Sequence, residues 1–332
     1  MNENYIILSV SSNDLGKRID VFLSLKIKDF SRSKLQKLIK SKNVKFNDEL
    51  VLDRSLKLNQ IGKIIIIVPK PKEINLKPQN LELKVIFEDE HLILVDKPAG
   101  MVVHPGAGVT ENTLVNGLLF QCKNNLSGIN GELRPGIVHR LDKMTSGLII
   151  AAKDDFTHNS LSKQFKERKV NKNYKVLVWN KLPKIDGEII TNIERSKKNR
   201  KNMSVTTNIR GKEAVTQYKL LEQFQIEKTI ISYINCQILT GRTHQIRVHM
   251  EYLGNSVIGD STYKKNSSKN QFPQKVIDLI TEDFIKKNRH ALHAASLSFI
   301  HPKTKKTLLF EANLPNDMSN LLKILQKTKK NS

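Results

Sequence analysis

The stretch His139-Arg140-Leu141-Asp142-Lys143-Met144-Thr145-Ser146-Gly147 lies between two apolar segments, Pro135-Gly136-Ile137-Val138 before it and Leu148-Ile149-Ile150-Ala151-Ala152 after it. Both segments are typical of buried strands, so the stretch predicts a tight polar loop inside one core. The loop carries one acid, Asp142, with a cation two residues before it and another directly after it. A rigid loop of this kind can keep a carboxylate ionised and aimed; the alternative is a structural role, in the turn or in an ion pair with Arg140.

Strand-like runs outnumber helices in the chain around this loop. The pattern predicts helices at 113–120 and 157–168, and strands at 85–87, 91–95, 174–179, 215–221, 230–239, 295–300 and 308–310. Strands that follow one another with few intervening helices favour an α+β fold on a mostly antiparallel sheet. We therefore expect one large domain over residues 85–318, followed by a basic tail, 319–332, that forms a short fraying helix.

The N-terminal part of the chain predicts a separate small α/β module over residues 14–75. A helix at 32–40 is followed by strands at 44–46 and 63–68, and a polar, proline-bearing segment, 76–84, has the composition of a linker. One face of the helix carries four cations, namely Arg32, Lys34, Lys37 and Lys40. This face is either a solvated surface or a contact for an anionic partner.

Composition points to a polyanionic partner. The 332 residues include 56 Lys and Arg against 32 Asp and Glu, which gives a net charge of +24. Nucleic acid is the commonest partner of such a chain; a membrane surface and a compositional background are the alternatives. The cations are spread along the chain rather than gathered on one amphipathic helix, which argues against a membrane. Two distant cysteines, no signal-peptide pattern and no apolar run of about 20 residues predict a cytoplasmic protein.

Four further segments, taken in order with the Asp142 loop, carry a family resemblance. They are Val95 to Pro105 with its Lys-Pro-Ala-Gly turn, Lys172 to Val176, Leu239 to Met250, and His290 to Ala294. Together they resemble the pseudouridine synthases of large-subunit ribosomal RNA, and His104-Pro105-Gly106-Ala107-Gly108 resembles the branch called D. Segments 17–23, 31–39 and 44–47 are similar to the RNA-binding module named after small-subunit ribosomal protein four.

The resemblance implies an isomerase that cleaves the N1–C1′ bond of a uridine, turns the uracil and joins C5 to C1′. It makes Asp142 the catalytic carboxylate, Arg247 its partner and Tyr174 the active-site tyrosine; core packing is the alternative for Tyr174. A carboxylate suits a reaction that builds positive character at C1′. The residues leave open whether Asp142 attacks C1′, attacks C6 or removes the C2′ proton. No cofactor or metal is implied, because no redox change occurs and no group leaves.

The resemblance also assigns RNA contacts and a partner. Arg140 would fill the place of the flipped uridine, and Arg242 and His244 would contact RNA together with the basic helix. The expected partner is large-subunit rRNA or an assembling large subunit. We expect the protein to be a monomer and to bind no membrane.

Three alternatives to this hypothesis remain. A non-catalytic RNA-binding or ribosome-assembly factor would keep the fold, and a related enzyme would act on transfer RNA. A zinc hydrolase would need His at i and i+4 with a nearby Glu, whereas His244 and His249 are five residues apart and His290 and His293 three.

Overall fold

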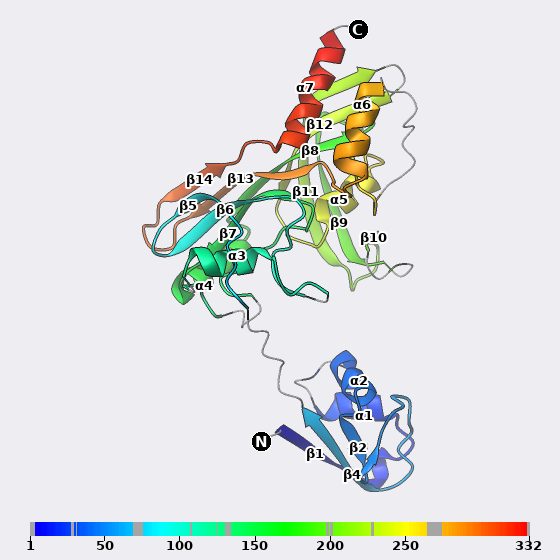
Figure 1. Ribbon diagram of the computed structural model, residues 1–332. Coiled ribbons are helices and arrows are strands. Elements are labelled where there is room, and N and C mark those ends of the chain that lie inside the picture. The colour runs from blue at the N-terminus through cyan, green and yellow to red at the C-terminus, as the bar shows by residue number, and fades with distance from the viewer. Residues whose placement is uncertain are drawn as a thin grey trace. The chain divides into compact units, whose positions relative to one another are not determined.

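The computed structural model consists of two units, residues 1–73 and 74–332. It describes residues 4–27, 30, 32–68, 76–106, 108–123, 125–129, 134–196, 199, 202–226, 229–263 and 274–330. The ribbon is shown in Figure 1. Among the described residues no helix is both long and apolar enough to cross a membrane.

The small unit packs two helices on a four-stranded antiparallel sheet. Its elements are β1 (Asn4–Val10), a 3₁₀ turn (Ser12–Asp14), α1 (Ile19–Lys26), α2 (Arg32–Lys40), β2 (Val44–Phe46), β3 (Glu49–Leu50) and β4 (Gly62–Val68). The strand order is β1-β4-β2-β3. Phe22 of α1, Leu35 of α2 and Ile64 of β4 are buried in one core. The helix predicted at 32–40 and the strands at 44–46 and 63–68 are confirmed.

The small unit begins earlier than expected. Its edge strand β1 pairs with β4 from Asn4 to Val10, so the expected start at residue 14 is wrong. The alternation Tyr5, Ile7 and Ser9 against Ile6, Leu8 and Val10 is typical of a half-buried strand, and Val10 is 1% exposed. The seven residues of β1 therefore belong to the module.

The large unit is built on one sheet of ten strands. Its strands are β5 (Lys84–Glu88), β6 (Leu92–Lys97), β7 (Ser146–Ala152), β8 (Asn171–Trp179), β9 (Asp186–Arg195), β10 (Met203–Thr206), β11 (Lys212–Ile226), β12 (Thr229–Ile238), β13 (Leu292–Ile300) and β14 (Thr307–Glu311). Their order is β10-β9-β11-β12-β8-β13-β7-β6-β5, and β14 pairs with β13. Every pairing is antiparallel except the one between β13 and β7, which confirms the α+β prediction.

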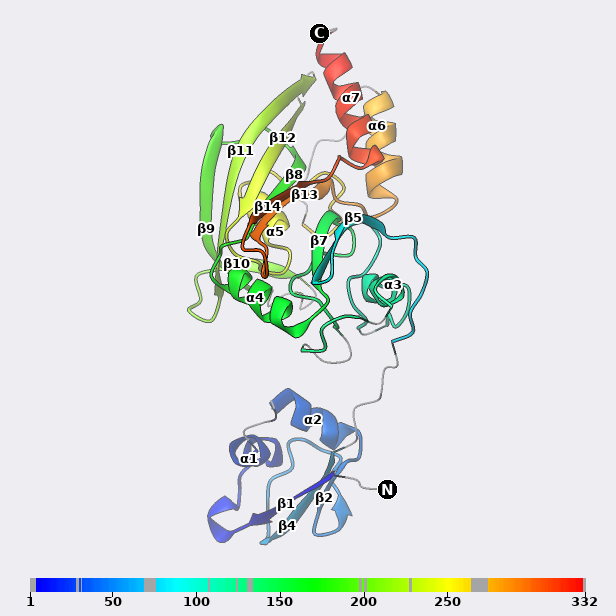
Figure 2. The ribbon, with the colours of Figure 1, turned by 90° about the vertical axis from the view of Figure 1, so that its left-hand side faces the viewer.

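Helices cover both faces of this sheet. They are α3 (Leu114–Gln121), α4 (Asp155–Lys166), α5 (Gln245–Tyr252), α6 (Gln274–Leu279) with a π-helical turn (Ile280–Ile285), and α7 (Asn316–Lys330). Ile149 of β7 shares a core with α3, whereas its neighbour Ile150 lies in the cluster that contains Leu161 of α4. Strand β7 is buried along its whole length for this reason, and Figure 2 shows it with α4 on one side and α3 on the other.

The segment expected to be a linker belongs to the large unit. The carbonyl oxygen of Lys77 accepts a hydrogen bond from Asn116 of α3 at 2.9 Å, and the Gln79 amide donates to the Asn116 carbonyl at 3.0 Å. Leu76 and Leu83 pack against the core. Residues 76–83 are polar in sequence, but these contacts fix them on α3, so the expectation of a free linker at 76–84 is wrong.

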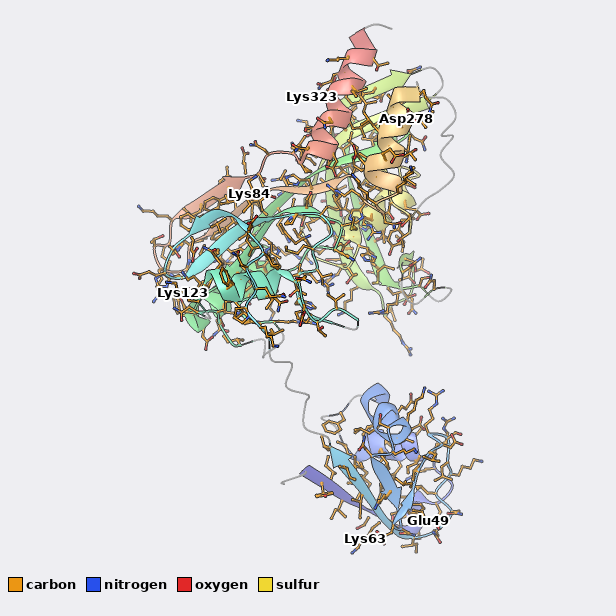
Figure 3. The ribbon with its side chains drawn as sticks, in the orientation of Figure 1. Glu49, Lys63, Lys84, Lys123, Asp278 and Lys323 are labelled. Carbon is orange, nitrogen blue, oxygen red and sulfur yellow. The ribbon has the colours of Figure 1, made fainter. Side chains whose placement is uncertain are left out.

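The C-terminal segment is also integrated rather than a tail. Met318, Leu321 and Leu325 of α7 are each 0% exposed, and α6 and α7 run side by side in both views (Figures 1 and 2). Of the basic residues of this helix, Lys323 and Lys327 are exposed, and Lys323 lies on the outer side of α7 (Figure 3). A boundary at residue 319 would cut through this amphipathic helix.

Candidate active site

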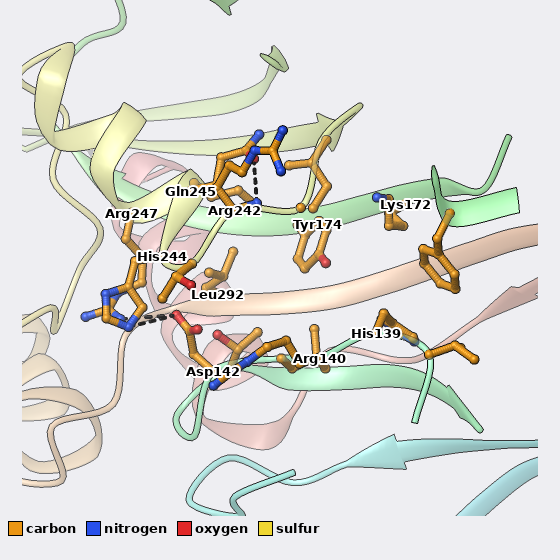
Figure 4. A pocket seen from close by; sticks show the side chains of 18 of the residues that line it. His139, Arg140, Asp142, Lys172, Tyr174, Arg242, His244, Gln245, Arg247 and Leu292 are labelled. Carbon is orange, nitrogen blue, oxygen red and sulfur yellow. Dashed lines mark hydrogen bonds and ion pairs between the residues drawn. The ribbon is translucent and has the colours of Figure 1, made fainter. Parts of the chain in front are cut away.

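A cavity of about 350 Å³ opens between the loop before β7, strand β8 and the turn from β12 into α5. All six site residues predicted in the large domain line it, namely Arg140, Asp142, Tyr174, Arg242, His244 and Arg247. Figure 4 shows Asp142 facing His244 and Arg247, with Tyr174 above it on β8. The four predicted RNA-binding residues of α2 belong to the small unit: Lys40 is exposed there, and the side chains of Arg32, Lys34 and Lys37 lie outside the described residues.

The loop that carries Asp142 is not flanked by two strands. Strand β7 follows it as predicted, but the segment expected as a strand at 135–138 forms only an isolated bridge, between Ile137 and Ala151. Gly147 fixes the end of the loop with a backbone φ of +112°. A Cβ there would lie 2.3 Å from the carbonyl oxygen of Ala294 in β13. Only glycine allows this close approach of the two strands.

Two buried cations hold the backbone of the loop. Lys97, at the end of β6, donates to the carbonyl oxygen of Lys143 at 3.2 Å. Arg289, before β13, donates to the carbonyl oxygen of Met144 at 2.7 Å and to the hydroxyl of Ser146 at 2.9 Å. Burial, together with the charge of Arg289, lowers the pKa of Lys97 to about 7. These bonds fix the residues that directly follow Asp142.

The carboxylate of Asp142 is paired with a buried arginine from α5. Arg247 Nη1 donates to Asp142 Oδ2 at 3.2 Å, while its Nε and Nη2 form a fork on Asp260, at 2.6 and 2.9 Å. Asp260 is fully buried and also accepts the amide protons of Thr262 and Tyr263, at 2.9 and 3.0 Å. Burial lowers the pKa of Arg247, but the contacts with Asp260 and Asp142 outweigh it and raise the pKa. Arg247 is therefore a fixed positive charge beside Asp142.

His244 completes the surroundings of Asp142. Its Nδ1 lies 2.8 Å from the hydroxyl of Tyr263, and its Nε2 lies 3.9 Å from Asp142 Oδ2. The Tyr263 hydroxyl accepts the amide proton of Met203 at 2.7 Å, which leaves the phenol proton for Nδ1. Burial lowers the pKa of His244, although the charge of Asp142 opposes this. The contacts thus indicate a neutral imidazole that carries its proton on Nε2, toward Asp142. Both this contact and that of Arg247 reach Oδ2, and neither uses Oδ1.

Tyr174 lies on the wall of the cavity, in the middle of β8. It is 6% exposed and belongs to the main core, so it packs in the core and lines the cavity at once. Burial and, after it, the charge of Asp142 raise the pKa of its hydroxyl. The side chain is therefore a neutral phenol that offers an aromatic face, rather than a phenolate.

Two arginines lie toward the mouth of the cavity. Arg140 is exposed. Because Asp142 pairs with Arg247, the structure does not support the alternative in which Asp142 only forms an ion pair with Arg140. Arg242 donates through Nε to the carbonyl oxygen of Glu213 at 2.8 Å. Its amide donates to Gln245 Oε1 at 3.0 Å, which fixes the turn into α5.

The sequence patterns did not indicate that Asp260 and Tyr263 belong to the site, or that Lys97 and Arg289 anchor the loop. Lys97 lies in the Lys-Pro-Ala-Gly turn, the one signal that could have found it. Asp260 is a single acid in a loop, and no pattern marks it.

Two of the histidines weighed above as metal ligands, His249 and His290, are engaged in hydrogen bonds with hydroxyl groups. His249 bonds to Thr191 and Thr216, each at 2.9 Å, and His290 to Thr145 at 2.8 Å. In the described part of the chain, no three His, Cys, Asp or Glu side chains converge in a way that could hold a metal ion.

Comparison with known proteins gives consistent matches. A family model described as RNA pseudouridylate synthase matches residues 91–252. The chain is 39% identical over 325 residues to the ribosomal large subunit pseudouridine synthase D of Zymomonas mobilis, with 98% of each chain covered. It is 40% identical over 328 residues to the protein of the same name from Neisseria meningitidis serogroup B, covering 98% of this chain and 83% of that one. The structure of human RNA pseudouridylate synthase domain containing 1 shares the fold, with a TM-score of 0.52 and 22% identity over 78% of this chain and 98% of that chain.

Proposed function

Because this chain belongs to the RNA pseudouridylate synthase family, and is an isomerase that acts on RNA, we propose that its substrate is large-subunit ribosomal RNA. Two relatives that match nearly the whole chain, from Zymomonas mobilis and Neisseria meningitidis, carry that substrate in their names. The net charge of +24 fits a polyanion of this size. Bacterial ribosomes are assembled in the cytoplasm, which is therefore the compartment that this substrate implies.

The observation that carries the proposed chemistry is the pairing of Asp142 with Arg247. In the proposed reaction Asp142 is the carboxylate that acts on the target nucleotide as its N1–C1′ bond breaks. Arg247 supports this role because its guanidinium pairs with the carboxylate and its fork on Asp260 fixes the direction of that pair. Since the Oδ1 atom is used by neither Arg247 nor His244, it is available to the substrate.

Tyr174 is proposed to pack its ring against the uracil while the base turns. A neutral phenol with an apolar face suits stacking, whereas its raised pKa makes it a poor base in the ground state. Pseudouridine formation changes no oxidation state and releases no group, so the proposal requires neither cofactor nor metal.

The cations outside the carboxylate cluster are proposed to bind RNA. Arg140 would take the place of the uridine when it leaves its stack, which costs roughly a few kcal/mol. Arg242 and His244 would contact the flipped nucleotide and its strand. The small unit, with Lys40 exposed at the end of α2, would add affinity through phosphate contacts. We propose that the protein does this as a monomer, on free rRNA or on an assembling subunit.

The test is pseudouridine mapping on unmodified large-subunit rRNA. Wild-type protein and Asp142→Asn are incubated with the RNA, and carbodiimide labelling with primer extension locates new stops. We expect stops with wild type alone, and RNA affinities that agree within about threefold, because the change removes one charge that faces the cavity. Residual turnover of Asp142→Asn near the wild-type rate would overturn the role of Asp142. Stops on transfer RNA but not on rRNA would overturn the substrate, and none on any RNA would favour a non-catalytic binding factor.

A further inference from the structure

Lys172 is a buried cation on the wall of the cavity. It precedes Tyr174 by two residues in β8, so both side chains lie on the same side of the strand. Both line the cavity, as Figure 4 shows. Lys172 is only 8% exposed, which is rare for a lysine without a charged partner.

The protein itself does not neutralise this charge. In the described segments no carboxylate pairs with Lys172; its ammonium group lies 5.6 Å from the centre of the Phe165 ring. That ring stacks on His139 at 4.7 Å. His139 accepts the amide proton of Ile150 and is neutral, since burial lowers its pKa to about 3. An aromatic face is a weak partner for a desolvated cation. Burial accordingly lowers the pKa of Lys172 to about 8.

The other buried cation of the cavity shows the contrast. Arg247 has Asp260 and Asp142 as partners. The charge of Asp142 is thereby balanced by Arg247, whereas burial is the only cause of the lowered pKa of Lys172. Figure 4 shows Lys172 on the other side of Tyr174 from Asp142. An unbalanced buried charge of this kind costs stability, which is expected where a ligand supplies the counter-charge.

We propose that Lys172 forms a phosphate subsite that holds a phosphodiester group flanking the target uridine. The inference rests on the proposed function, because RNA is the ligand. Phosphodiesters are the anionic groups of RNA, and a neutral carbonyl or hydroxyl would leave the buried ammonium uncompensated. Two residues along a strand span about 6.6 Å, so a phosphate on Lys172 lies close to a base stacked on Tyr174. The subsite would fix the register of the RNA strand, and with it the uridine that reaches Asp142.

The test compares Lys172→Met with Lys175→Met. Methionine keeps the length of the lysine stem and removes the charge. Lys175 lies in the same strand, on the opposite side, and does not line the cavity. The RNA is a hairpin that contains the modified uridine, made either unmodified or with one uncharged methylphosphonate at a single linkage around that uridine. Affinities and turnover are measured for each protein with each RNA.

When the methylphosphonate stands at the linkage that contacts Lys172, wild type and Lys175→Met should bind the hairpin about tenfold more weakly than the unmodified RNA. A loss of this size is typical of a hydrogen bond to a charged group. Lys172→Met should bind the unmodified hairpin about tenfold more weakly and lose nothing further at that linkage. Its melting temperature should equal or exceed that of wild type, because a buried unpaired charge is removed. Equal affinities of Lys172→Met and wild type for the unmodified hairpin would overturn the subsite. So would a methylphosphonate at each linkage that weakens the binding of both proteins by the same factor. Failure of wild type to modify the hairpin, with the Lys172-dependent linkage still present, would instead overturn the proposed substrate and leave the phosphate subsite standing.

Discussion

Replacing Asp260 by Asn should expose how strongly the active site depends on a residue that does not face the substrate. Asp260 accepts two hydrogen bonds from Arg247 and two from backbone amides. An Asn has one acceptor oxygen, so its amide group takes the place either of Oδ2, where it faces Arg247 Nε, or of Oδ1, where it faces Arg247 Nη2 and the two backbone N–H groups. All of these groups are donors, and one side of the network is left unpaired.

The size of the effect follows from the burial of this pair. Removing one partner of a buried ion pair costs about 3–5 kcal/mol. For a unit of this size about 1 kcal/mol shifts the melting temperature by roughly 2–4 °C, so we expect a decrease of roughly 6–20 °C. Arg247, freed from its fork, can also move relative to Asp142, and a displacement of about 1 Å can cost on the order of 100-fold in rate.

The assay combines thermal melts with single-turnover isomerisation. Glu282→Gln is the matched control, because it also removes a carboxylate from an ion pair, with Lys286, but both side chains are more than half exposed. That change should cost about 0–1 kcal/mol. A double variant, Arg247→Met with Asp260→Asn, should recover stability without activity, because the Asn oxygen can still accept the two backbone amide protons while its amide group no longer faces a guanidinium. If Asp260→Asn melts within about 2 °C of wild type and keeps its rate, the reasoning is refuted.

Three further predictions concern the loop and the small unit. Gly147→Ala should destabilise the protein by about 1–3 kcal/mol or more, since its Cβ would collide with the carbonyl of Ala294; denaturant unfolding measures this, and an unchanged midpoint would contradict it. Lys97 has a pKa of about 7 in the folded protein against 10.5 ordinarily. The unfolded chain therefore binds more protons between these two pH values, and the stability of the protein should rise with pH there. Thermal melts from pH 6.5 upward should show a shallower rise of the melting temperature for Lys97→Met than for wild type, and parallel curves would argue against the buried ammonium. Deleting residues 1–73 should weaken RNA binding and flatten its salt dependence, because fewer phosphates are neutralised; an equal slope for the truncated protein would exclude the small unit as an RNA anchor.

Local patterns determined much of the fold. The helix at 32–40 and the strands at 44–46 and 63–68 were predicted because their periods of apolar residues are local properties. Strand β7 was predicted for the same reason, and the mostly antiparallel sheet followed from strands in direct succession. The segment 76–83 and α7 were misjudged because their composition is polar, whereas their apolar residues are few and contact distant elements.

In the candidate site, too, some features follow from local sequence motifs and others only from the tertiary structure. Asp142, Tyr174 and Arg247 could be named from the sequence, because each lies in a short motif and the motifs occur in order. That these side chains line one cavity depends on the sheet order, which places β8 and β13 between β12 and β7. The fork of Asp260 on Arg247, the bonds of Lys97 and Arg289 to the loop, and the unbalanced charge of Lys172 depend on it as well. A sequence shows which residues are polar or apolar, but the burial of a charge and the identity of its partner are set by chain segments far apart. Only the tertiary structure could decide them.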